Sequence, residues 1–71
     1  MDIDQKRLAL GKAIRKRRES QGLSQNTLAL MIGSSKSHIW RIETARVGVG
    51  IDDLARIANA LGVEVRDLID F

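Results

Sequence analysis

The 71-residue chain contains no cysteine and no proline, a single histidine, and only one tryptophan and one phenylalanine as aromatic residues. Without cysteine it forms neither disulfides nor thiolate metal sites, and one histidine, His38, is too few for a histidine-rich metal site. No stretch approaches the roughly 20 apolar residues of a membrane-spanning helix, and Met1–Gln5 lacks the apolar core of a secretory signal. We therefore expect a soluble, cytoplasmic protein without a metal or cofactor.

The length of the chain suits one domain, over residues 1–71. A domain of this size buries only roughly 60% of the surface of its unfolded chain, so its stability is marginal. Because disulfides and thiolate metal sites are excluded, stability must come from close helix packing, from a partner subunit, or from both.

The net charge of +3 is distributed unevenly. Residues 1–22 carry seven basic and three acidic side chains, a net charge of +4. Residues 23–48 carry three basic side chains and one acidic side chain (+2), and residues 49–71 carry two basic and five acidic side chains (−3). The first two thirds therefore suit contact with a polyanion, which the last third would repel. Ordinary charge scatter on solvated helices explains the same numbers equally well, so charge alone does not decide.

Apolar residues recur at helical spacing along the chain, without strand-like alternation or internal repeats. Ser24 and Ser35 are favourable N-caps, and Gly22 and Gly62 suit the left-handed position that ends a helix. These signals predict five helices, over about residues 4–21, 25–32, 36–43 or 44, 51–61 and 65–69. The inner face of the fourth is a stripe of five apolar residues, Ile51, Leu54, Ile57, Ala58 and Leu61.

Residues 24–43 are the most informative segment. A tight turn at Gly33-Ser34 joins two short helices, and Gly33 permits a backbone conformation that is costly for other residues. The inner faces of the two helices carry Leu28, Ala29, Ile32, Ile39 and Ile42. Such a corner leaves the outer face of helix 36–43 free to enter the major groove of DNA, as in a helix-turn-helix.

Four motifs, in order and in one register, resemble the lambda-repressor/Cro-like (XRE-type) family of phage and bacterial regulators. They cover about residues 8–70: Leu10-Gly11…Ile14…Arg18, Leu23-Ser24-Gln25…Leu28-Ala29…Gly33, Ser37-His38-Ile39-Trp40-Arg41-Ile42-Glu43, and Leu54…Ile57-Ala58-Asn59-Ala60-Leu61-Gly62-Val63…Leu68. The resemblance implies an all-α, compact five-helix lambda-repressor-like DNA-binding domain with a helix-turn-helix, encoded by a bacterium or phage.

The chain departs from the family pattern in the loop after the recognition helix. Thr44-Ala45 stand where a glycine usually follows, and Val49-Gly50 replace the usual proline before the fourth helix. These departures leave the path of residues 44–50 open. The chain also departs from the family pattern at three other positions, Arg17, Ser34 and Glu64.

Helix 36–43 is expected to contact base edges through three side chains. Ser37 and Arg41 lie four residues apart on one face, and Lys36 projects from the N-terminal end. Arginine and lysine bind guanine O6 and N7, and serine contacts several edges.

The remaining DNA contacts are expected at phosphate or sugar. Gln25 resembles the family residue that binds a phosphate and braces the recognition helix, while Ser35, His38 and Arg46 are candidates for backbone contacts. Trp40 has two alternatives, contact with DNA sugar or a thymine methyl group, or cover for the loop around Val47 and Val49.

Arg18 and Glu43 resemble a family ion pair that joins the first helix to the recognition helix, a structural role. The alternative is two unrelated surface charges. Inside the first helix, Gly11 costs about 1 kcal/mol relative to alanine, which a close packing contact would explain.

The C-terminal helices, over about residues 51–70, are the expected dimerising part. Leu68 is the best candidate to pack inward, which leaves Val65, Ile69 and Phe71 as a self-complementary apolar patch for a two-fold dimer. Entirely intramolecular packing of these residues is the alternative.

The sequence therefore predicts a sequence-specific, double-stranded DNA-binding transcriptional regulator, a homodimer on a two-fold operator. Restriction–modification controllers, phage-type repressors and antitoxins share this compact form, and an antitoxin would also have a protein partner. An enzyme has no support, because there is no nucleophile–base spacing, phosphate-cradling loop or metal cluster.

Overall fold

A computed structural model describes all of residues 1–71 as five α-helices without strands. The helices are α1 (Ile3–Ser20), α2 (Gln25–Met31), α3 (Lys36–Glu43), α4 (Ile51–Leu61) and α5 (Val65–Leu68). The predicted all-α, five-helix fold is confirmed, and each expected boundary lies within one residue of the observed one.

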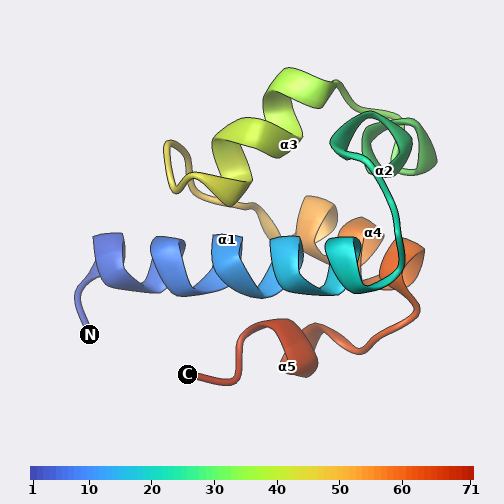
Figure 1. Cartoon of the computed structure of the whole chain (residues 1–71). Helices are drawn as coiled ribbons and strands as arrows, with labels where there is room; N and C mark the ends of the chain where they lie inside the picture. The colour runs from blue at the N-terminus through green and yellow to red at the C-terminus, as the bar shows by residue number, and fades with distance from the viewer.

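The long helix α1 is the axis of the molecule (Figure 1). Helices α2 and α3 lie on one side of it, α4 lies behind it, and α5 lies on the side opposite to α3. The two ends of the chain lie at the same end of the molecule, below the loop that follows α3.

The N-terminal ends of the first three helices are capped as the residue types suggest. Asp2 accepts a hydrogen bond from the Gln5 N–H, Ser24 from the Thr27 N–H, and Ser35 from the His38 N–H, at 2.7, 3.0 and 3.2 Å. Each cap satisfies a backbone donor that the helix itself leaves unpaired.

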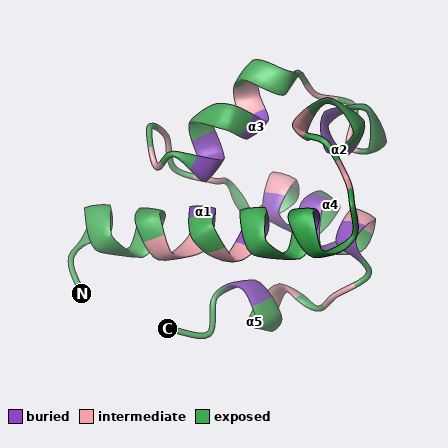
Figure 2. Cartoon of the chain, in the orientation of Figure 1, coloured by how far each residue is buried: buried purple, intermediate pink, exposed green.

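One apolar core joins all five helices (Figure 2). Its fully buried large side chains are Ile14, Leu28, Ile39, Ile42, Ile57 and Leu68. The expected α4 stripe is buried at four of its five positions, but Ile51 is 70% exposed, so its assignment to the core was wrong. Ile51 is the first residue of α4, one turn before Leu54, where no other helix covers it.

Gly11 marks the closest approach of α1 to the recognition helix. A Cβ atom built on Gly11 would lie 2.7 Å from the carbonyl oxygens of both Ile42 and Glu43. This backbone contact is the close packing that the sequence predicted from a glycine inside a helix. It fixes the C-terminal end of α3 against α1.

The loop after α3 begins with a residue in the left-handed conformation. Ala45 has φ +61°, its N–H donates to the Ile42 carbonyl, and the Arg46 N–H donates to the Arg41 carbonyl at 2.8 Å. The helix thus ends in the pattern that usually carries glycine. Alanine pays about 1–2 kcal/mol for this conformation.

The rest of the loop returns to the core along α1. Val47 and Val49 are half-buried against the core, and the Arg7 guanidinium lies within 3.2 Å of where a Cβ on Gly48 would stand. The path of residues 44–50, which the sequence left open, therefore runs along α1.

Replacing Ala45 with glycine is expected to raise the free energy of unfolding by about 1 kcal/mol, because glycine adopts the left-handed conformation without a Cβ clash. Urea unfolding followed by helical circular dichroism measures the change. Ala55, exposed in the middle of α4, is the matched control: Ala55→Gly should lose about 1 kcal/mol. A loss of stability in Ala45→Gly would contradict the strain argument.

Candidate nucleic-acid interface

The corner between α2 and α3 has the geometry of a helix-turn-helix. Gly33 has φ +68°, and the Ser34 N–H donates to the Ala29 carbonyl at 2.8 Å, which closes the turn. Leu28, Ala29 and Ile39 are fully buried between the two helices and the core. The arrangement predicted for residues 24–43 is therefore present, with the outer face of α3 exposed.

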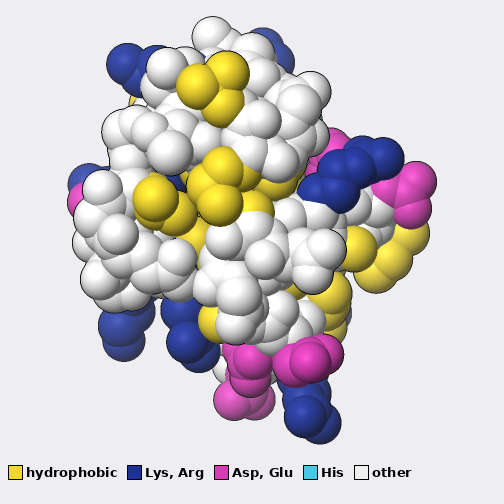
Figure 3. Space-filling view, turned by 90° about the vertical axis from the view of Figure 1, so that its right-hand side faces the viewer, with side chains coloured by type: hydrophobic (Ala, Val, Ile, Leu, Met, Phe, Trp, Pro, Cys, Tyr) yellow, Lys and Arg dark blue, Asp and Glu magenta, His cyan; other side chains and the backbone are white.

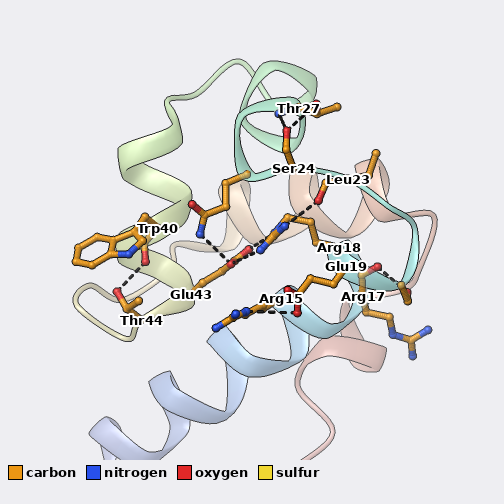
Figure 4. A network of polar contacts seen from close by, with 12 residues as sticks. Arg15, Arg17, Arg18, Glu19, Leu23, Ser24, Thr27, Trp40, Glu43 and Thr44 are labelled. Atoms are coloured by element: carbon orange, nitrogen blue, oxygen red, sulfur yellow. Dashed lines mark hydrogen bonds and ion pairs between the residues drawn. The ribbon is translucent and has the colours of Figure 1, made fainter.

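A buried ion pair fixes the C-terminal end of α3 (Figure 4). Arg18 Nε donates to Glu43 Oε2 at 2.7 Å, and Arg18 Nη2 donates to Glu43 Oε1 at 2.9 Å. The two side chains are only 9% and 2% exposed. The pair expected from the family resemblance is thus observed, and it links α1 to the recognition helix.

Further hydrogen bonds complete this network. Arg18 Nη1 donates to the Leu23 carbonyl at 2.7 Å, and Gln25 Nε2 donates to Glu43 Oε1 at 3.1 Å. The hydrogen bond to Glu43 is the chief cause that raises the pKa of the Arg18 guanidinium, against an opposing effect of burial. The Gln25 side chain therefore contacts the last residue of the recognition helix, and no buried polar side-chain atom lacks a partner.

A polar groove of about 480 Å³ lies where α1, α2 and α3 meet. It is lined by Arg15, Arg18, Ser24, Gln25, Asn26, Lys36, Trp40, Glu43 and Thr44. Glu43 is neutralised by Arg18, and Arg15 forms an exposed ion pair with Glu19 at 3.3 Å. Lys36 has no ion-pair partner, so it gives the groove a positive character that suits an anionic ligand. Sequence reasoning missed Arg15 and Asn26. The position of Arg15, one turn before Arg18 on the same helix, was the available signal.

The exposed face of α3 bears the three side chains expected to contact bases. Lys36, Ser37 and Arg41 are all exposed. Trp40 is 46% exposed and lines the groove, with the Arg46 guanidinium 5.5 Å from its ring centroid. The indole is therefore not enclosed by the loop, and one of its faces carries a cation–π contact.

Two of the expected backbone-contact residues have partners within the protein. The Ser35 hydroxyl accepts the His38 N–H as the cap of α3. The His38 imidazole is turned toward α4, where its Nε2 lies 3.1 Å from Asp53 Oδ2. This second contact was not predicted from the sequence.

Apolar side chains are exposed outside the groove at the N-terminal end of α1, at the start of α4, on α2 and at the C-terminus. Leu68 is buried, as expected, while Ile69 and Phe71 are 43% and 50% exposed and Val65 is half-buried. At the end of the molecule that carries α2, hydrophobic side chains also reach the surface (Figure 3). Leu30 and Met31 are 72% and 52% exposed on that helix, which the sequence did not indicate.

No group of three or more His, Cys, Asp or Glu side chains is placed to hold a metal ion. None of the helices combines the length and the apolar character needed to cross a membrane.

Comparisons with known proteins agree with this geometry. The family described as helix-turn-helix matches residues 14–68. The control protein C.BamHI of Bacillus amyloliquefaciens is 36% identical over 66 residues, which are 92% of this chain and 82% of that protein.

Solved structures of regulators superpose closely on the chain. The restriction-modification controller protein C.AhdI from Aeromonas hydrophila has a TM-score of 0.90 and 31% identity, over 96% of this chain and 99% of that one. The clp gene regulator ClgR from C. glutamicum has a TM-score of 0.86 and 33% identity, over 90% and 83%. The chain therefore belongs to the lambda-repressor/Cro-like (XRE-type) helix-turn-helix family and is a DNA-binding transcriptional regulator, not an enzyme.

Proposed function

We propose that the protein binds a two-fold operator as a homodimer, with α3 in the major groove of each half-site. The observation that carries this proposal is the exposed face of α3, which bears Lys36, Ser37 and Arg41 and is held rigidly by the Arg18–Glu43 pair. These three side chains contact base edges. Gln25, Trp40 and Arg46 border the same face and contact phosphate or sugar, and Ser35 keeps its capping role beside them.

The relatives indicate the kind of regulation. C.AhdI is a restriction-modification controller protein and C.BamHI a control protein, and both align over most of this chain. We propose the same role here: control of a restriction–modification system by a protein whose own concentration sets operator occupancy.

Selection of binding sites from random duplexes tests the proposed function directly. We expect a two-fold motif whose half-sites lie about one helical turn apart, near 10 base pairs centre to centre. Recovery of a single unpaired half-site would contradict the homodimer. Recovery of no preferred sequence would contradict specific recognition by α3.

Operator affinity is expected to fall steeply with salt, because cations of the groove and of α3 displace counterions from the DNA. If about five to eight phosphates are neutralised per dimer, the slope of log affinity against log salt is about −5 to −7. Fluorescence anisotropy with the selected duplex at several salt concentrations measures it. A slope close to zero would show that the surface formed by the groove and α3 does not bind DNA.

Arg41→Ala is expected to weaken binding to the selected duplex by roughly 1–3 kcal/mol per half-site and to relax the preference at one base position. Gln25→Ala is the comparison: it should weaken binding without changing which bases are selected, because Gln25 contacts the backbone. If selection with the Arg41→Ala protein returns the wild-type motif, Arg41 does not contact a base.

A further inference from the structure

The two ends of the recognition helix are held by different kinds of contact. At its C-terminal end, α3 is fixed by the buried Arg18–Glu43 pair and by the backbone contact with Gly11. At its N-terminal end, the contact between His38 and Asp53 is the only hydrogen bond or ion pair that joins α3 to α4. Ile39, in the same turn, is fully buried, so packing also holds this end, and its one polar contact to α4 is made by a histidine.

The His38–Asp53 contact is part of a three-residue chain. His38 Nε2 lies 3.1 Å from one carboxylate oxygen of Asp53, and Arg56 Nη1 donates to the other at 3.2 Å. The side chains of His38 and Asp53 are 28% and 36% exposed, so water screens the contact only partly. Asp53 stands in the first turn of α4, where the helix dipole favours a carboxylate.

Few other charged groups surround the imidazole. Helix α4 supplies Asp53 and Arg56, with Asp52 beside them, and α2 has no titratable side chain. Helix α1 meets α3 at the opposite end, through Gly11. On α3 itself the charged neighbours are Lys36 and Arg41.

We propose that His38 is a positioning residue that makes operator binding depend on pH. Histidine side chains change charge between about pH 5 and 8. When the imidazole is protonated, its hydrogen bond to Asp53 becomes an ion pair, which is the stronger interaction. The N-terminal turn of α3 is then held more firmly on α4, with Lys36 and Ser37 in place for base contact. The proposal rests on the proposed DNA-binding function, and it makes operator affinity rise as the pH falls.

The test compares dissociation constants for the selected duplex at pH 6 and pH 8. For the wild type we expect binding to be about threefold tighter per half-site at pH 6, hence roughly tenfold for a dimer, the range of a partly exposed ion pair. His38→Gln should abolish this ratio. Asp53→Asn should reduce it to the His38→Gln value, because the protonated imidazole then has no carboxylate to pair with.

Asp52→Asn is the matched control for Asp53→Asn. It removes a carboxylate from the same turn of α4, but Asp52 makes no contact with His38. We expect it to keep the wild-type ratio. Equal ratios in Asp53→Asn and Asp52→Asn would overturn the proposal, as would a ratio that survives in His38→Gln.

A salt titration at pH 6 supplies an independent readout, which remains decisive if Asp53→Asn does not fold. A positioning residue leaves the slope of log affinity against log salt unchanged in His38→Gln. A histidine that binds phosphate directly would change that slope by about 0.9 per half-site, and this result would overturn the proposal. Failure of the proposed function has a different signature, a wild-type protein that prefers no duplex at either pH.

Discussion

Replacing Arg18 with alanine is expected to lower the free energy of unfolding by about 3–5 kcal/mol, the usual result of leaving a buried charge unpaired. Glu43 is 2% exposed and would keep only the hydrogen bond from Gln25. The Leu23 carbonyl would also lose its donor. Because a domain of this size has only about 4–10 kcal/mol of stability, the variant should be substantially unfolded at moderate denaturant concentration.

Urea unfolding followed by circular dichroism measures this loss, with Arg17→Ala as the matched control. Arg17 is the preceding residue of the same helix and is exposed, so its replacement should change stability by no more than about 0.5 kcal/mol. An unchanged unfolding midpoint in Arg18→Ala would contradict the buried pair. Combining Arg18→Ala with Glu43→Ala in a double-mutant cycle isolates the pairwise energy from the loss of packing.

The effect of this pair on stability should not vary with pH in the ordinary range. The pKa of Arg18 is raised in the folded protein, so its contribution is fully present below the unfolded-state pKa and is lost only above it. Both values lie far above neutral pH. The Arg18–Glu43 pair therefore does not account for a change in operator affinity between pH 6 and 8, and His38 is the only histidine in the chain.

Most of the fold was predictable from the sequence because local signals agree. Ser24 and Ser35 cap the helices they were expected to cap, and Gly22, Gly33 and Gly62 all have positive φ. Helical periodicity placed four of five α4 positions in the core. It failed at Ile51 because periodicity shows which face points inward, but not where along the helix the neighbouring elements stop covering it.

The contacts of the candidate site were less predictable, because they join residues that are distant in the sequence. The Arg18–Glu43 pair spans 25 positions and was expected only from the family resemblance. His38 and Asp53 lie on helices whose relative placement no spacing rule encodes, so a side chain expected at DNA has a partner on α4. The absence of the usual glycine after the recognition helix indicated that the loop at Ala45 is unusual. It did not predict that the alanine itself adopts the left-handed conformation.

Aspartate in place of Ile69 is expected to abolish the proposed dimer while leaving the helices folded. Leu68 holds α5 on the core and is 1% exposed, whereas Ile69 and Phe71 are about half exposed beside it. The segment 49–71 carries a net charge of −3. A dimer interface formed by this segment therefore lies on a surface that DNA would avoid. The polar groove where α1, α2 and α3 meet then stays free to contact DNA.

The size of the expected effect follows from two-fold symmetry. The same patch faces itself across the axis, so Ile69→Asp places two carboxylates in one interface. Each unpaired buried charge costs about 3–5 kcal/mol, so the two together should raise the dissociation constant of the dimer by about ten-thousandfold or more. Operator affinity should fall with it, because a monomer contacts only one half-site.

Sedimentation velocity at micromolar concentration, free and with the selected duplex, distinguishes the possible interfaces. Leu30→Asp is the matched control, since Leu30 is an exposed apolar residue of α2 and lies in a different apolar surface. We expect Leu30→Asp to remain dimeric without DNA and Ile69→Asp to sediment as a monomer with unchanged helical circular dichroism. If instead Leu30→Asp is monomeric and Ile69→Asp is dimeric, the dimer interface lies on α2. A wild-type protein that is monomeric both free and on its site would refute the dimer, because each half-site would then be bound independently and no single spacing would be favoured.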